Sequence, residues 1–314
     1  MKEPRIGVIG LGGQSAFLSA HHFPAPGETI SCRGLFFEPG GKGYNQAIAC
    51  ARMGVPTVFI GAMGKDDNAE VCRKDLINQG VTPCLVEKEV PTAYAVITTD
   101  ERGENTVSVF PGAAKELTPE DLRSDAVMAQ LAQCSCLLLQ NELTPECLLE
   151  AICIGKELEI PVIFNPAPAD NVPLEALKKS HWITPNYGEA KWLTGFSQEE
   201  MPTARFLADR FREMGILQGV ITMGSKGAAV MEAGKVTRIP PFTYGQAIDT
   251  TGAGDTFNGV LAAGLASGIQ IQKAALYAAV AAGISVTQQG AAGSIPTKEE
   301  IDAAYEAWEI EEKG

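Results

Sequence analysis

The stretch Ala51-Arg52-Met53-Gly54, followed by the largely apolar run Val55 to Ile60, decides the fold class. A glycine directly after helix-like residues suits the left-handed backbone conformation that closes many helices. A continuous apolar strand indicates burial on both faces of a sheet. The same helix-break-strand pattern recurs at Ile77 to Val86, Lys156 to Phe164 and Arg212 to Thr222. We therefore predict an α/β fold with a mainly parallel central sheet covered by helices.

Two segments interrupt this alternation. Residues 13–37 contain Pro24, Pro26 and Gly27 between two apolar runs, and residues 91–110 contain two β-type runs around a polar turn. The second segment is typical of a β-hairpin. We expect the two segments to form a small β-sheet lid over a site. The main α/β domain is then expected to comprise residues 1–12, 38–90 and 111–314.

The composition limits the function. The 314 residues are 45% apolar, which is enough for a sizeable core, and the formal net charge is −13. An acidic protein is a poor binder of nucleic acid or anionic membranes, so we expect neither partner. No run approaches the roughly 18 apolar residues of a membrane span. The eight cysteines are scattered without a metal-binding or redox spacing, which favours the cytoplasm.

The strongest candidate for chemistry is the turn Thr251-Gly252-Ala253-Gly254-Asp255, which precedes a run of small residues typical of a packed helix. Because Gly252 and Gly254 have no side chain, backbone N–H groups of this turn could approach an anion at the positive end of that helix. An aspartate there fits a catalytic base beside a phosphate. It fits a helix cap equally well, so the residues alone leave both interpretations open.

Neither standard phosphate-binding loop is present. Gly10-Leu11-Gly12-Gly13-Gln14-Ser15 has serine where the dinucleotide fingerprint needs its third glycine, and Gly41-Lys42-Gly43 lacks the other residues of a Walker loop. The sequence therefore argues against a dinucleotide-binding protein and against a P-loop protein.

Three other segments are candidates for binding, each with a plain structural alternative. Gly41, Lys42, Gly43 and Asn45 begin a helix-like run and could bring backbone and an amide to a polyol, or form a capped loop. Asn186 and Glu189 have the spacing of a capping box, and could also order the water around Mg²⁺. The stretch Thr222 to Gly227 could hold a nucleotide or turn the chain.

Taken together and in this order, these segments resemble the ribokinase-like, phosphofructokinase-B-type family of sugar kinases. The likeness extends over nearly the whole chain. Six segments carry it: Phe23 to Thr29, Gly40 to Gln46, Asn165 to Ala169, Thr184-Pro185-Asn186, Asp249 to Gly259, and Gly290 to Pro296.

The resemblance implies a three-layer α/β/α domain with a β lid, and transfer of the ATP γ-phosphate to a primary hydroxyl. It implies that Asp255 is the catalytic base and that Gly252, Ala253 and Gly254 form an anion hole. Nucleotide contacts are implied at Asn186, Thr222, Gly224, Ser225, Gly227 and Gly254. Glu189 would belong to the Mg²⁺ water network. Sugar contacts are implied at Gly13, Ser15, Gly41, Lys42, Gly43, Asn45, Glu142 and Asp255.

Ribokinases also bind a monovalent cation, usually K⁺, beside the anion hole. The matching positions here are Asp249, Thr251, Ser285, Gln288, Gly290 and Ser294. Family members often dimerise through the lid, where apolar residues such as Phe36 and Phe37 could serve as the contact.

One departure from the family pattern concerns the substrate. Ribokinases carry an Asn-x-Asp triplet whose aspartate binds two sugar hydroxyls, and Gly13-Gln14-Ser15 stands there in this chain. Loss of a charge-assisted hydrogen bond is worth roughly 1.5–3 kcal/mol. We expect an ATP-dependent carbohydrate kinase, with D-ribose the first substrate to try. The alternatives are a kinase for another pentose, a ketose or a nucleoside, and a noncatalytic sugar or nucleotide sensor.

Overall fold

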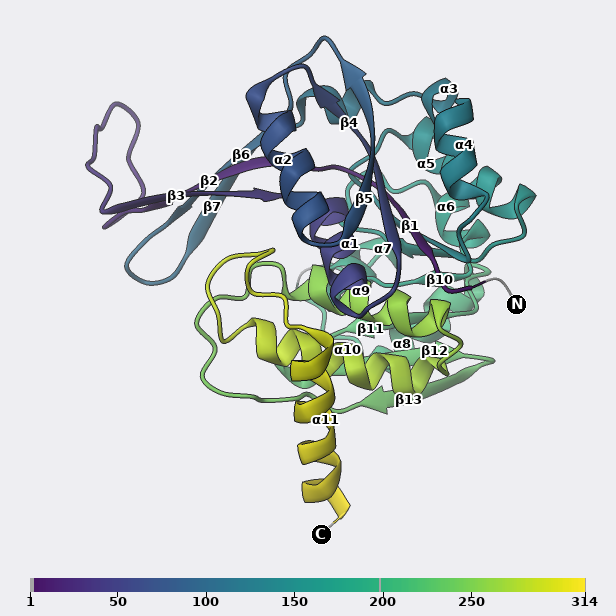
Figure 1. Ribbon diagram of the computed structural model, residues 1–314. Helices are drawn as coiled ribbons and strands as arrows, with labels where there is room; N and C mark the ends of the chain where they lie inside the picture. Colours follow the sequence, from purple (N-terminus) through teal and green to yellow (C-terminus); the bar gives the residue numbers. More distant parts are fainter. Residues whose placement is uncertain (1–2, 198, 314) are drawn as a thin grey trace.

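Nine strands with apolar residues on both faces form the central sheet (Figure 1). The computed structural model describes residues 3–197 and 199–313, with the backbone alone for residues 309–313. The ends of the expected main domain, residues 1–2 and 314, lie outside the described residues. The strands are β1 (Ile6–Ile9), β4 (Thr57–Gly64), β5 (Val81–Lys88), β8 (Cys136–Gln140), β9 (Val162–Asn165), β10 (Trp182–Ile183), β11 (Gly219–Thr222), β12 (Ala228–Glu232) and β13 (Lys235–Ile239).

The strand order is β13-β12-β11-β10-β9-β8-β1-β4-β5, and all neighbouring strands from β11 to β5 are parallel. β12 and β13 pair antiparallel at one edge. The chain builds β4 and β5 on one side of β1 and then β8 onward on the other. Such a reversal between β1 and β8 opens a crevice at the carboxyl ends of the strands, where ligands bind in open α/β sheets.

Side chains that alternate along the strands divide the core into two apolar layers. Val8 and Phe59 point into one layer, and Ile9 and Ile60 point into the other. The first layer is covered by α1 (Lys42–Arg52), α2 (Asp67–Asn78), α9 (Ala253–Ala266), α10 (Ile271–Ser285) and α11 (Lys298–Lys313). The second is covered by α3 (Pro119–Leu122), α4 (Asp125–Leu131), α5 (Pro145–Glu157), α6 (Leu174–Lys179), α7 (Tyr187–Leu193) and α8 (Ala204–Glu213). The predicted three-layer α/β/α arrangement is confirmed.

The glycines that close helices have the backbone conformation expected of them. Gly54, Gly80 and Gly215 follow α1, α2 and α8 with φ of 76°, 77° and 87°. Glu159 takes the same left-handed conformation after α5, with φ of 54°. The local signal that indicated the fold therefore corresponds to real helix ends.

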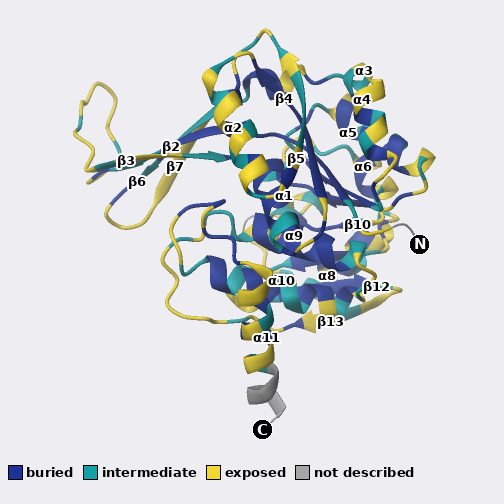
Figure 2. Ribbon diagram, viewed as in Figure 1, coloured by how far each residue is buried: buried dark blue, intermediate teal, exposed yellow. Residues whose placement is uncertain are grey.

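A separate four-stranded sheet projects from the body of the molecule (Figure 1). Its order is β3-β2-β6-β7, with β2 (Gly13–Ser19), β3 (Gly34–Gly40), β6 (Ala93–Thr99) and β7 (Asn105–Phe110). The β6–β7 pair is the expected hairpin. β3 continues to Gly40, three residues past the boundary expected for the lid. Figure 2 shows these strands largely exposed or half-buried, in contrast to the buried central strands.

The turns of the main body include two 3₁₀ segments, η1 (Gly112–Glu116) and η2 (Gly224–Lys226). None of the helices in the described part of the chain is both long enough and apolar enough to cross a bilayer.

Candidate active site

Three cavities adjoin at the carboxyl ends of the central strands. The lid-side cavity, of about 320 Å³, lies between the small sheet and α1. The central cavity, of about 240 Å³, shares Lys42 and Asp255 with it. The outer cavity, of about 400 Å³, shares Thr222, Thr250 and Gly254 with the central one. The arrangement can hold two ligands that meet at the central cavity.

Asp255 lies where the lid-side and central cavities meet, and it is buried with 8% of its surface exposed. Its two carboxylate oxygens accept hydrogen bonds from different side chains of α1. Asn45 Nδ2 donates to one over 3.1 Å, and Gln46 Nε2 donates to the other over 3.0 Å. The helix cap is Gly252, not Asp255. The interpretation of Asp255 as a helix cap is therefore wrong, and its carboxylate is a fixed acceptor facing the two cavities.

A buried chain of amides holds Gln46 in place. Gln140 Nε2 donates to Gln46 Oε1 over 2.7 Å, which orients the Gln46 amide so that its nitrogen faces Asp255. The same nitrogen also donates to Asn165 Oδ1 over 3.1 Å, and Asn165 Nδ2 donates to the carbonyl of Thr184 over 2.8 Å. Gln140 Oε1 is buried without a partner in the described part of the chain, but each amide of the network makes at least one buried hydrogen bond. Buried hydrogen bonds between side chains rigidify their surroundings, so this network fixes the orientation of the Asp255 carboxylate.

The turn before α9 presents unpaired backbone donors beside that carboxylate. Gly252 has φ of 74°, and the Thr250 carbonyl accepts from Ala253 N–H over 3.3 Å. Among the described contacts, neither Gly254 N–H nor Asp255 N–H has a partner. Free N–H groups in the first turn of a helix form an anion-binding site.

Of the residues expected to contact the sugar, Gly13, Ser15, Gly41, Lys42, Asn45, Glu142 and Asp255 line the lid-side cavity. Gly43 is not among the lining residues. A Cβ at Gly43 would lie 2.8 Å from the Gly10 Cα, so this glycine lets α1 approach the end of β1.

Asn45 Oδ1 is buried without a hydrogen-bond partner in the described part of the chain. A buried acceptor of this kind requires a donor from a ligand or water.

Lys42 and Glu142 set the charge of the lid-side cavity. The pKa of Lys42 is raised, chiefly by the negative charge of Asp255. The Lys42 backbone N–H donates to Glu142 Oε2 over 3.0 Å. Burial raises the pKa of Glu142 to about 7, against the lowering effect of Lys42. The cavity is therefore lined by one cation, Lys42, and by the carboxyl groups of Glu38, Glu142 and Asp255, of which Glu142 has a pKa near neutrality.

Asn186 and Glu189 line the central cavity and form a capping box at the start of α7. Asn186 Oδ1 accepts from Glu189 N–H over 2.8 Å, and Glu189 Oε2 accepts from Asn186 N–H over 2.7 Å. The structural alternative for this pair is thus confirmed. Burial raises the pKa of Glu189. The box uses the single oxygen of Asn186 and one of the two oxygens of Glu189. Glu189 therefore keeps a second acceptor oxygen and Asn186 keeps its amide N–H donors for groups in the cavity.

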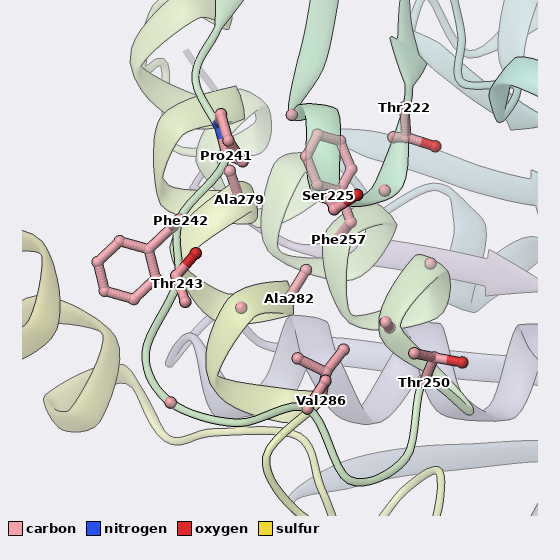
Figure 3. Close-up of a pocket in the computed structure, with 17 residues that line it drawn as sticks. Thr222, Ser225, Pro241, Phe242, Thr243, Thr250, Phe257, Ala279, Ala282 and Val286 are labelled. Atoms are coloured by element: carbon pink, nitrogen blue, oxygen red, sulfur yellow. The ribbon is translucent and has the colours of Figure 1, made fainter. Parts of the chain in front are cut away.

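The outer cavity has mainly apolar walls (Figure 3). Ala279 and Ala282 of α10 lie along one wall with Val286, the residue directly after the helix. Phe242 lies on the segment that crosses the cavity. Thr222, Gly224, Ser225, Gly227 and Gly254, all expected to contact a nucleotide, line this cavity. The position suits a flat apolar group with a polar tail toward the central cavity.

The residues matched to a monovalent cation site lie around the loop that follows α10. The Asp249 carboxylate accepts from Thr251 N–H over 2.9 Å and from Gly290 N–H over 3.0 Å. Gln288 N–H donates to the carbonyl of Ser285 over 3.1 Å. Ser294 is fully buried, and its hydroxyl donates to the Ala291 carbonyl. Thr251 and Ala291, the latter on this loop, both line the lid-side cavity, which places the loop beside it.

A sequence profile described as pfkB family carbohydrate kinase matches residues 15–298. The chain belongs to this family. It is 36% identical over 296 residues to a ribokinase of Haemophilus influenzae, covering 93% of this chain and 95% of that one. It is also 36% identical over 301 residues to a bifunctional ribokinase/ribose-5-phosphate isomerase A of Fructilactobacillus sanfranciscensis, where it spans 95% of its own length and 55% of the relative.

Among solved structures, the Arabidopsis thaliana ribokinase complexed with ribose and ATP superposes with a TM-score of 0.86 at 27% identity. The match covers 97% of this chain and 99% of that one. The chain is therefore a carbohydrate kinase with the ribokinase-like fold.

Sequence reasoning missed several residues that build the site of this pfkB-family kinase. Gln46, Gln140 and Asn165 form the amide network, although none was assigned a role. A usable signal existed: Gln140 and Asn165 each end a buried apolar strand, and these two positions are register partners in β8 and β9. A polar residue at the carboxyl end of a buried parallel strand lies at the usual ligand-binding edge.

Proposed function

We propose that the protein transfers the γ-phosphate of ATP to a primary hydroxyl of a small sugar, with D-ribose the first candidate. The observation that carries the proposal is Asp255, a buried carboxylate held by two amide donors where two cavities meet. In this position it accepts the proton of the attacking hydroxyl. The ribokinase relatives, one of them complexed with ribose and ATP, support the choice of both substrates.

Each cavity takes one part of the two substrates. The sugar occupies the lid-side cavity, the phosphates the central cavity, and the adenine ring the apolar outer cavity. Gly252, Ala253 and Gly254 shape the helix N-terminus so that the N–H groups of Gly254 and Asp255 face the transferring phosphoryl group. Donors aimed at that charge stabilise the transition state. Lys42 lines both the sugar and phosphate cavities, and its charge offsets that of Asp255.

Mg²⁺ would be held by the ATP phosphates and by water ordered at Glu189, and it neutralises phosphate charge when bound. The described residues contain no cluster of three or more His, Cys, Asp or Glu side chains suited to a metal ion. A single carboxylate fits Mg²⁺, which keeps several waters and binds through few protein groups.

A monovalent cation, K⁺ by preference, would be held by Asp249 and Thr251 with the loop residues Ser285, Gln288, Gly290 and Ser294. One carboxylate and several backbone carbonyls form a suitable donor set for such an ion. Rates measured in K⁺ and in tetramethylammonium at equal ionic strength test this part of the proposal. Equal rates in the two salts would remove it.

The decisive experiment on substrate is a panel of sugars and nucleosides assayed for ATP consumption. Ser15, where ribokinases carry aspartate, favours a second candidate function, a kinase for another pentose, ketose or nucleoside. Highest kcat/KM with ribose supports the first proposal, and a higher value with another member supports the second. Ligand binding without any turnover would support a noncatalytic sensor and reject both.

The small sheet offers a surface for a homodimer. Leu35 and Phe37 on β3 and Phe110 on β7 are each at least half exposed. Light scattering of the protein and of Phe37→Ser tests this, and a monomeric wild type would reject it.

We place the reaction in the cytoplasm on the basis of the scattered free cysteines, which cell fractionation tests.

A further inference from the structure

Glu38, to which sequence reasoning assigned no role, lies on the lid strand β3 beside the sugar cavity. Its register partner on β2 is Ser15, the residue that stands in place of the ribokinase aspartate. Directly opposed residues on neighbouring strands project from the same face of a sheet. Both residues line the lid-side cavity together with Asn45 and Asp255. The strand pairing therefore brings a carboxylate next to the position where one is missing.

The backbone of the 290–293 loop fixes the Glu38 carboxylate. Ala291 N–H donates to one oxygen over 3.1 Å, and Gly293 N–H donates to the other over 2.7 Å. A Cβ at either Gly290 or Gly293 would lie 3.1 Å from a Glu38 oxygen, so the loop packs closely on the carboxylate. No ion pair involves Glu38 within residues 3–197 and 199–313. A carboxylate accepts about four hydrogen bonds, so these two leave capacity for a ligand.

The wall that runs from Glu38 to Asn45 is rich in acceptors. A Cβ at Gly40, between them in the chain, would lie 3.4 Å from Ser15 Oγ and 3.8 Å from Asn45 Oδ1. Asn45 Oδ1 is the buried acceptor that has no partner in the described part of the chain. A ligand that satisfies this wall must bring several donors, as adjacent sugar hydroxyls do.

We infer that Glu38 is a specificity-determining residue. From β3, the strand next to Ser15, its carboxylate accepts hydrogen bonds from sugar hydroxyls and so replaces the carboxylate that is absent at Ser15. This inference rests on the proposed function. The preferred acceptor is then a sugar with a free hydroxyl pair remote from the phosphorylated carbon. A competing role is purely mechanical, in which Glu38 fastens the small sheet to the 290–293 loop. The experiment has to separate these roles.

The test compares wild type and Glu38→Gln on the preferred sugar and on analogues that each lack one hydroxyl. Glutamine keeps a carbonyl oxygen for one loop N–H but has no charge. We expect kcat/KM for the complete sugar to fall about 10-fold or more, mainly through KM, because one charge-assisted hydrogen bond is lost. For the analogue without the contacted hydroxyl, the variant and wild type should agree within about 2-fold. KM for ATP should not change.

A mechanical role predicts a different pattern, with kcat/KM reduced by one common factor for the sugar and all its analogues. That result would overturn the inference, as would unchanged kinetics in a wild type that phosphorylates the sugar. A wild type without any sugar turnover would instead reject the proposed function. Glu101→Gln is the matched control, since Glu101 is a lid carboxylate that pairs with His21 and Arg33 and lines none of the cavities.

Moving the carboxylate back provides a second test that does not depend on Glu38→Gln alone. Ser15→Asp in the Glu38→Gln background should restore most of the lost kcat/KM. Ser15→Asp alone places two carboxylates opposite each other, and like charges in that geometry repel. It should therefore lower kcat/KM for the sugar about 10-fold. If Ser15→Asp improves sugar binding in the presence of Glu38, the inference is wrong.

Discussion

Gln46→Met removes the amide that orients Asp255 while it keeps the length of the side chain. Gln46 donates to the Asp255 carboxylate and to Asn165 Oδ1, and it accepts from Gln140. The change therefore breaks one charge-assisted bond and leaves two buried amides each short of a partner.

The expected size of the effect follows from these three bonds. A hydrogen bond to a charged group is worth about 1.5–3 kcal/mol, and each tenfold change in rate corresponds to about 1.4 kcal/mol. Asn45 still donates to Asp255, so we expect kcat to fall about 10- to 100-fold rather than to vanish. The two unsatisfied amides should lower the free energy of unfolding by about 2–4 kcal/mol.

Steady-state kinetics at saturating ATP, with a denaturant titration of the same preparation, measure both effects. Gln272→Met is the matched control, because Gln272 also lies in a helix and donates to a carboxylate, that of Glu232, without lining a cavity. The control should keep wild-type kcat. If Gln46→Met folds and keeps kcat within about 2-fold, the amide network does not position the base.

Three further changes test separate parts of the site. Burial raises the pKa of Glu142 from 4.5 to about 7, so the folded protein favours the protonated carboxyl group. The contribution of Glu142 to the free energy of unfolding is therefore fully present below about pH 4.5 and is lost as the pH rises through 7. Glu142→Gln should therefore gain about 3 kcal/mol in unfolding free energy relative to wild type between about pH 5 and 8, and a pH-independent difference would contradict this. Gly252→Ala, with φ of 74° and a Cβ 3.0 Å from the Ala291 Cα, should lower kcat at least 10-fold, whereas Gly195→Ala, with φ of 83° and open space, should lose stability alone. Ala282→Leu narrows the outer cavity and should raise KM for ATP about 10-fold with KM for the sugar unchanged; a wild-type KM for ATP would place the nucleotide elsewhere.

Local sequence signals were sufficient for the fold. Helix-closing glycines and continuous apolar strands are set by the conformation and burial of residues that are neighbours in the chain, so the sequence alone reveals them. Gly54 and Gly80 have the left-handed φ that this reasoning requires. β3 continues three residues past the lid boundary expected at residue 37, because Pro39 and Gly40 are not typical strand residues and only pairing with β2 keeps them in the sheet.

The site was less accessible from the sequence because its contacts join distant parts of the chain. Asp255 and Asn45 are 210 positions apart, and their hydrogen bond exists because α1 packs against α9. Taken alone, the segment fits Asp255 as a base or as a cap, and the family resemblance favours the base. The packed structure excludes the cap, because Gly252 occupies the N-cap position. Glu38 went unassigned for the same reason, since no sequence signal gives the register that places it opposite Ser15.

The most direct test of the central claim is the turnover number of Asp255→Asn. Asparagine keeps the shape and can still accept from Asn45 or Gln46, but it cannot take up a proton as a base. We predict that kcat falls by about 1,000-fold or more. General-base catalysis contributes up to about 10,000-fold, so a loss of this size is within its range. ATP binding, measured by calorimetry, should stay within about 3-fold of wild type. A variant that retains near-normal kcat would contradict the assignment of Asp255 as the catalytic base.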